Sequence, residues 1–139
     1  MITKQLSIFI ENRPGRLAEV TKIIADNNVN IRALSIADTT HFGILRLIVD
    51  NANDVEAMLK EKGMTVSVTS VIAVKLNDKP GALADVLGVL HKENIAIEYM
   101  YAFLSQNTVD SAYVVMRIEE DIRAMKVLIE NGYEGPGIN

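Results

Sequence analysis

The first residues of the chain alternate between apolar and polar side chains, which is the period of a half-buried strand. Leu6, Ile8 and Ile10 occupy the apolar positions. After Pro14-Gly15 the apolar residues instead follow the period of a helix, and Asn27-Asn28 ends that pattern. The residues expected on the buried face of the helix are Leu17, Ala18, Val20 and Ile24. This stretch therefore predicts a strand followed by a helix.

The remainder of the first half predicts two strands, a second helix and a closing strand. The expected elements are strand Ile31–Ala37, strand Phe42–Val49, a helix over Asp54–Lys62 and strand Thr65–Thr69. Asp38-Thr39-Thr40-His41 joins the first two strands, and Gly63 stops the helix. The first half thus has the order strand, helix, strand, strand, helix, strand.

The same pattern recurs 66 residues later, which is the spacing from Pro14 to Pro80. The matching segments are Asn12–Val20 with Asp78–Val86 and Asn28–Ile31 with Asn94–Ile97. Added residues within Ala102–Ser111 lengthen the offset to 69, at which Gly63 matches Gly132. The elements expected in the second copy are strand Val71–Leu76, helix Gly81–Glu93, strand Ile97–Leu104, strand Ala112–Ile118 and helix Asp121–Asn131. A closing strand is in question, because Tyr133–Asn139 is short and contains Pro and Gly.

Each half has the element order of a ferredoxin-like βαββαβ domain, an α+β fold with an antiparallel sheet and two helices on one face. We therefore expect two tandem domains, residues 1–69 and residues 70–139. A half-chain of about 70 residues is a marginal size for one core. The strand Ile44–Val49 is apolar on both sides, although a sheet face open to water should be polar. This predicts that sheet faces or edges are covered, either by the other domain or by a second copy in a homodimer.

Composition narrows the classes of function. The chain has no cysteine and a net charge of −4, which excludes thiolate metal sites and argues against a general attraction to nucleic acid. No apolar run approaches the ~20 residues that span a bilayer, and Met1–Gln5 does not begin a signal peptide. Tyr99, Tyr101 and Phe103 alternate as in RNA-binding sheets, but the acidic balance favours a pocket or dimer face instead. We expect a cytoplasmic protein with no nucleic-acid or membrane partner.

The repeated element has two parts. The first part is Asn or Asp, any residue, Pro, Gly, any residue and Leu. The second part follows a helical stretch and is Asn, an aliphatic residue, any residue and Ile. It occurs as Asn12–Leu17 with Asn28–Ile31 and as Asp78–Leu83 with Asn94–Ile97. This element resembles the ACT domain family, and the resemblance covers nearly the whole chain. It implies a non-catalytic regulatory protein that binds a free amino acid where domains meet. It also implies that the Pro-Gly loop and the start of the second strand supply the contacts.

The Pro-Gly loops also give a physical reason for binding a carboxylate. Each places a helix N-terminus, with unpaired N–H groups and the positive end of the dipole, after a strand. Gly15 and Gly81 lack a Cβ, so a ligand can approach the backbone closely. An ammonium group would face Asn12, Asn77 or Asp78. The residues expected to bind are Asn12, Pro14, Gly15, Arg16, Leu17, Asn30 and Ile31 in the first copy, and Asn77, Asp78, Pro80, Gly81, Ala82, Leu83, Ala96 and Ile97 in the second.

Other functions stay open on the sequence alone. One alternative is an oligomerisation or regulatory subunit of an amino-acid biosynthetic enzyme, similar to the small subunit of acetolactate synthase, with no ligand of its own. An enzyme is not expected, because no nucleophile, base and orienting group occur together. His41 and His91 lack a second ligand at metal spacing, so neither a metal nor a cofactor is expected. The expected partners are an amino acid, a second copy of the chain and an enzyme of amino-acid metabolism.

Overall fold

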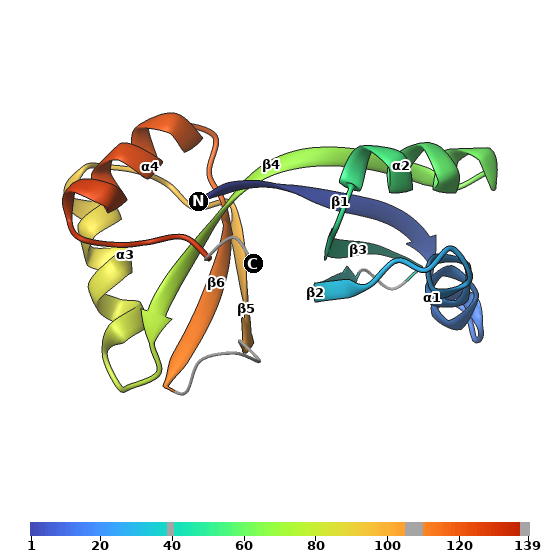
Figure 1. Cartoon of the computed structure of the whole chain (residues 1–139), viewed down its shortest axis with the longest axis horizontal. Coiled ribbons are helices and arrows are strands. Elements are labelled where there is room, and N and C mark those ends of the chain that lie inside the picture. Colours follow the sequence, from blue (N-terminus) through green and yellow to red (C-terminus); the bar gives the residue numbers. More distant parts are fainter. Residues whose placement is uncertain (39–40, 105–109, 137–139) are drawn as a thin grey trace. The chain divides into compact units, whose positions relative to one another are not determined.

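The computed structural model describes residues 1–38, 41–104 and 110–136, which form two compact units (Figure 1). The first unit is Lys4–Thr69, and the second unit combines Ser70–Asn139 with Met1–Thr3. Each unit buries a hydrophobic core made of its own residues. The predicted arrangement of two successive βαββαβ patterns is confirmed.

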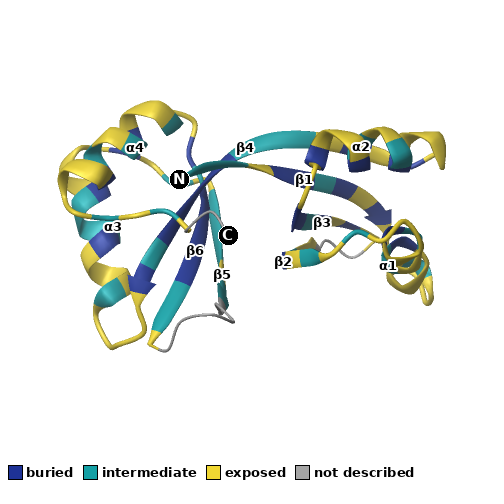
Figure 2. Cartoon of the chain, viewed as in Figure 1, coloured by how far each residue is buried: buried dark blue, intermediate teal, exposed yellow. Residues whose placement is uncertain are grey.

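The first unit contains the elements that the sequence predicts. They are β1 (Ile2–Glu11), α1 (Arg16–Asp26), β2 (Ile31–Asp38), β3 (Phe42–Val49), α2 (Ala52–Glu61) and the beginning of β4 (Thr65–Asn77). Its strand order is β2-β3-β1-β4, and β3 is antiparallel to both β1 and β2. Because Ile8 lies opposite Leu45, their side chains share one sheet face. Residues of α1 and α2 cover that face and complete the core (Figure 2).

The second unit repeats the plan. Its elements are the remainder of β4, then α3 (Ala82–Lys92), β5 (Tyr99–Leu104), β6 (Ser111–Arg117) and α4 (Asp121–Glu130). The strand order is β4-β6-β5, and β6 is antiparallel to both neighbours. Met116 on β6, Leu90 on α3 and Leu128 on α4 are fully buried in one cluster. No helix in the described ranges is long and apolar enough to cross a membrane.

The closing strand of the second unit comes from the other end of the chain. Tyr133–Pro136 follows α4 without forming a strand. Instead, Met1 accepts a hydrogen bond from the N–H of Ala73 on β4 (2.9 Å). Two residues further along β4, the N–H of Lys75 donates to the carbonyl of Glu134 (2.8 Å). The free edge of β4 is therefore paired first by the N-terminal residues and then by the segment after α4.

Several sequence-based boundaries differ from the structure, and one predicted turn lies outside the described residues. The predicted strands Thr65–Thr69 and Val71–Leu76 are one continuous strand, because Ser70 does not interrupt the extended backbone of β4. The strand predicted from Ile97 begins only at Tyr99. The tip between β2 and β3 includes Thr39 and Thr40, which lie outside the described residues.

The predicted buried face of α1 is too wide. Val20 and Ile24 are buried, but Ala18 is exposed and Leu17 retains 39% of its accessible surface. Residues four apart stand above one another on a helix, so one narrow stripe is enough to reach the sheet. Leu83 is exposed at the same place in α3. Both units therefore present an apolar side chain beside the Pro-Gly loop.

Candidate functional site

The two Pro-Gly loops have the same backbone hydrogen bonds. Asn12 N–H donates to the carbonyl of His41 (2.9 Å), and Asp78 N–H donates to that of Asp110 (2.8 Å). The bond from Glu19 N–H to Gly15 is matched by that from Asp85 N–H to Gly81, and each measures 2.9 Å. The sequence repeat is therefore also a repeat in three dimensions, and each residue of one loop has a counterpart in the other.

The loop glycines begin the helices in a left-handed conformation. Gly15 has φ 82° and Gly81 has φ 89°, a region that favours glycine. A Cβ at either position would meet nothing within 4 Å. A β-branched residue would therefore strain the turn whether or not a ligand is bound, so such a substitution does not isolate a binding site.

Part of the expected carboxylate site is already engaged within the loops. The N–H of Arg16 donates to Arg13 (3.2 Å), and the N–H of Ala82 donates to Lys79 (3.3 Å). These donors close a turn around each Pro-Gly pair, which the sequence-based expectation of free helix-terminal N–H groups did not include. The expected site residues at the start of the second strand do not all face solvent. Asn30 and Ala96 are exposed, whereas Ile31 and Ile97 pack against the cores of the first and second units.

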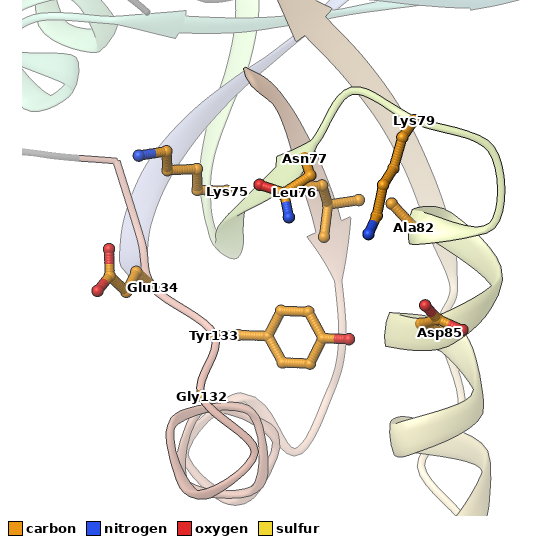
Figure 3. Close-up of a pocket in the computed structure, with 9 residues that line it drawn as sticks. All are labelled: Lys75, Leu76, Asn77, Lys79, Ala82, Asp85, Gly132, Tyr133 and Glu134. Atoms are coloured by element: carbon orange, nitrogen blue, oxygen red, sulfur yellow. The ribbon is translucent and has the colours of Figure 1, made fainter. Parts of the chain in front are cut away.

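A cavity of about 290 Å³ lies beside the second Pro-Gly loop (Figure 3). It is open on one side and is bordered by the end of β4, the loop, the first turn of α3 and the segment after α4. The lining residues are Lys75, Leu76, Asn77, Lys79, Ala82, Asp85, Gly132, Tyr133 and Glu134. Of the residues expected from the sequence, the cavity includes Asn77 and Ala82, whereas Asp78, Pro80, Gly81 and Leu83 are not part of its wall.

The cavity wall carries charges of both signs. Lys75 and Glu134 lie at one end, and Lys79 and Asp85 lie near Ala82 at the other (Figure 3). The Tyr133 ring extends between them, with its hydroxyl directed toward Asp85. Partial burial raises the pKa of Tyr133 above its usual value, and the nearby carboxylate of Asp85 raises it further. The phenol therefore stays protonated and can donate a hydrogen bond at neutral pH.

Sequence reasoning missed the segment after α4 as part of the site. Tyr133 and Glu134 are 50 or so positions from the Pro-Gly loop, and no local pattern connects them. Their only signal was the repeat itself, which aligns Tyr133 with Met64, a buried core residue of the first unit. By contrast, the aromatic residues of β5 do not line this cavity, and Phe103 instead stacks on Tyr113 at 5.2 Å.

The family model for an ACT domain pair matches residues 1–134. The chain belongs to this family. The ACT domain pair is also similar to a solved structure, protein BT0572 from Bacteroides thetaiotaomicron, with 42% identity and a TM-score of 0.90 over 96% of this chain and 91% of that one. No curated protein matches it.

More distant structures share the fold of this ACT domain pair. The regulatory subunit of aspartate kinase from Thermus thermophilus aligns with a TM-score of 0.66 at 13% identity, over 95% of this chain and 97% of that one. The regulatory subunit of aspartate kinase from Thermus flavus aligns with a TM-score of 0.61, also at 13% identity, over 93% and 95% of the two chains. At 13% identity, this similarity shows a shared fold alone.

Proposed function

We propose that this ACT domain pair is a non-catalytic regulatory protein that binds a free amino acid in the cavity beside Pro80-Gly81. The observation that carries the proposal is the cavity wall, which combines two lysines with two carboxylates. A free amino acid carries one group of each sign at neutral pH, so both can be paired there. The volume of about 290 Å³ is near the lower end of the ~300–1,000 Å³ typical of ligand pockets and suits a molecule of this size.

The family and the fold support a regulatory role. Two structures that share the fold are regulatory subunits of aspartate kinase, an association with an enzyme that their names state directly. We infer by analogy that this chain reports the level of an amino acid to an enzyme of amino-acid metabolism.

A thermal-shift screen against the twenty amino acids tests the proposal. A ligand that binds only the folded protein stabilises it, by about 2.7 kcal/mol at a hundred times its Kd. We expect one amino acid, or a chemically related group, to raise the melting temperature in a concentration-dependent way. If none does so at millimolar concentration, the amino-acid-binding function is wrong.

A second candidate function, assembly without a ligand, is favoured by exposed apolar side chains on the edge strand β2. Leu34 is 55% exposed and Ile36 is 42% exposed. They lie opposite Leu47 and Leu45, so they extend the apolar core face of the first unit to an open edge. We propose that a second copy of the chain covers this edge in a homodimer.

Light scattering on the wild type and two variants tests the homodimer. Replacing Leu34 and Ile36 together by lysine should convert a dimer into a monomer, because charged edge residues oppose pairing. Ile122→Lys is the matched control, since Ile122 is equally exposed (53%) but lies on α4. A wild-type monomer at micromolar concentration, or a double variant that stays dimeric, would contradict the proposed edge.

A further inference from the structure

The two units differ at the position that opens the cavity. Ala82 lines the cavity of the second unit, and its counterpart in the first unit is Arg16. Both residues are the first of their helix, after a glycine in the same conformation. The internal repeat thus presents one site twice, once with a small side chain and once with a long cationic one.

In the first unit the arginine side chain occupies this place. The Arg16 side chain is only 19% exposed, and its Nε is fully buried without a hydrogen-bond partner among the described residues. Its Nη1 donates to a carboxylate oxygen of Glu19 at 3.0 Å. Glu19 is one helical turn further along α1, where the pair is at i and i+3. The first unit therefore contains its own guanidinium, held by its own carboxylate.

In the second unit the carboxylate remains but the guanidinium is missing. Asp85 is the counterpart of Glu19, at the same position on α3, and it faces the cavity that Ala82 leaves open (Figure 3). Asp85 forms no ion pair with any described residue. The nearest cation on the wall, Lys79, is an exposed side chain on a flexible stem that can turn to solvent.

We propose that the ligand of the second unit is a cationic amino acid whose side-chain guanidinium or ammonium group binds Asp85 as Arg16 binds Glu19 in the first unit. At the opposite end of the cavity, Lys75 and Glu134 carry charges opposite to those of the α-carboxylate and the α-ammonium group. Figure 3 shows both side chains directed away from Tyr133, so they turn inward to pair with the ligand. The Tyr133 ring packs along the aliphatic part of the ligand between the two ends. This inference rests on the proposed amino-acid-binding function and gives it a chemical class and a stoichiometry of one ligand per chain.

Isothermal titration calorimetry of the full chain with arginine, lysine and citrulline tests the chemical class. Citrulline has nearly the shape of arginine but no charge on its side chain. We expect arginine or lysine to bind once per chain and citrulline to bind at least tenfold more weakly, because a hydrogen bond to a charged group is lost. Asp85→Asn should weaken the binding of arginine or lysine by a similar factor, while the affinity for citrulline should change by no more than about twofold.

A second set of variants tests the location. Ala82→Arg should place in the second unit the side chain that Arg16 places at the equivalent position of the first unit, and it should abolish ligand binding. Ala84→Arg is the matched control, because Ala84 is an exposed residue of α3 outside the cavity wall and receives the same charge and size. If Ala82→Arg fails to fold by circular dichroism, Asp85→Asn, a change at an exposed residue, decides the question alone.

The possible results separate this inference from the proposed function. If a neutral or acidic amino acid binds and the cationic ones do not, the cationic class is wrong and the amino-acid-binding function stands. If arginine binds but Ala82→Arg and Asp85→Asn leave its affinity unchanged, the assigned cavity is wrong and the function again stands. If no amino acid binds the wild type, the proposed function itself is overturned, and this inference with it.

Discussion

Single residues at the Pro-Gly loops set the geometry of the site through their backbone angles. Gly81 has φ 89°, and a side chain there costs about 1–2 kcal/mol, partly offset by the lower entropy of the unfolded chain. We expect Gly81→Ala to lower the free energy of unfolding by about 1 kcal/mol. Gly88→Ala is the matched control, because Gly88 lies inside α3 with open space around it and should raise stability by about 0.5–1 kcal/mol. Urea unfolding measures both, and a stabilised Gly81→Ala would contradict the left-handed turn.

The phenol of Tyr133 should make stability depend on alkaline pH. Burial, and then the charge of Asp85, raise its pKa in the folded state above the ordinary value of 10.0. The folded protein therefore binds the phenolic proton more tightly than the unfolded chain, so the free energy of unfolding falls as pH rises through and above 10. Tyr133→Phe should remove this dependence of stability on alkaline pH. Asp85→Asn should remove only the smaller part of it, which comes from the charge of Asp85.

Ultraviolet titration of the tyrosinate signal measures the same group directly. The chain has four tyrosines, and the component lost in Tyr133→Phe should be one that ionises above the ordinary range. An unchanged titration curve in Asp85→Asn, with a late component lost only in Tyr133→Phe, would assign the whole shift to burial.

The surroundings of the candidate cavity were partly predictable at the residue scale, for a physical reason. The repeat locates both Pro-Gly loops and makes the difference between Arg16 and Ala82 visible in the sequence. It does not reveal which side chains of the loop face a cavity, because that depends on the segment after α4. Tyr133 and Glu134 reach the loop only through tertiary packing, which periodicity and turn chemistry do not encode.

At the scale of elements, the N-terminal residues serve as the missing closing strand of the second unit. A Cβ at Gly135 would lie 2.8 Å from the backbone N and Cα of Met1, and backbone atoms cannot yield as a flexible side chain can. Gly135→Ala should therefore displace Met1 and remove the acceptor of the Ala73 N–H. We expect a loss of about 1–3 kcal/mol, the cost of an overpacked contact or an unsatisfied buried donor.

Hydrogen exchange locates the effect of Gly135→Ala. The amide of Ala73 should exchange faster in the variant, whereas the amides of β3 in the first unit serve as the internal control and should keep their protection. Equal loss of protection in β3 would mean that the contact is not local to the second unit.

The order and type of the elements were predictable because each unit is strongly periodic. The core strand positions Leu6, Ile8 and Ile10 and the helix stops at Asn28 and Gly63 are local signals, and the structure confirms them. The pairing of Met1 with Ala73 was not predictable, since it joins residues from opposite ends of a 73-residue segment through backbone hydrogen bonds alone. Backbone pairing leaves no side-chain pattern to read.

At the scale of the whole molecule, the two units are built differently along the chain. The first unit, Lys4–Thr69, is one continuous segment that contains β2 and β3, most of β1 and the beginning of β4. The second unit is discontinuous, because Met1–Thr3 reaches it from the beginning of β1. Unfolding of the second unit thus removes no residue from the first, whereas unfolding of the first unit releases the rest of β1 and with it the anchor of Met1–Thr3.

This asymmetry predicts different consequences for the same core substitution in the two units. Leu59 of the first unit and Leu128 of the second are both fully buried helix residues, and replacing either by alanine should cost about 2–5 kcal/mol. In native-state hydrogen exchange, Leu128→Ala should expose the amides of β6 while those of β3 keep their protection. Leu59→Ala should expose β3 and also the Ala73 amide, because the N-terminal strand loses its support. If Leu128→Ala deprotected β3 as strongly as β6, the two units would unfold together and the coupling would be symmetric.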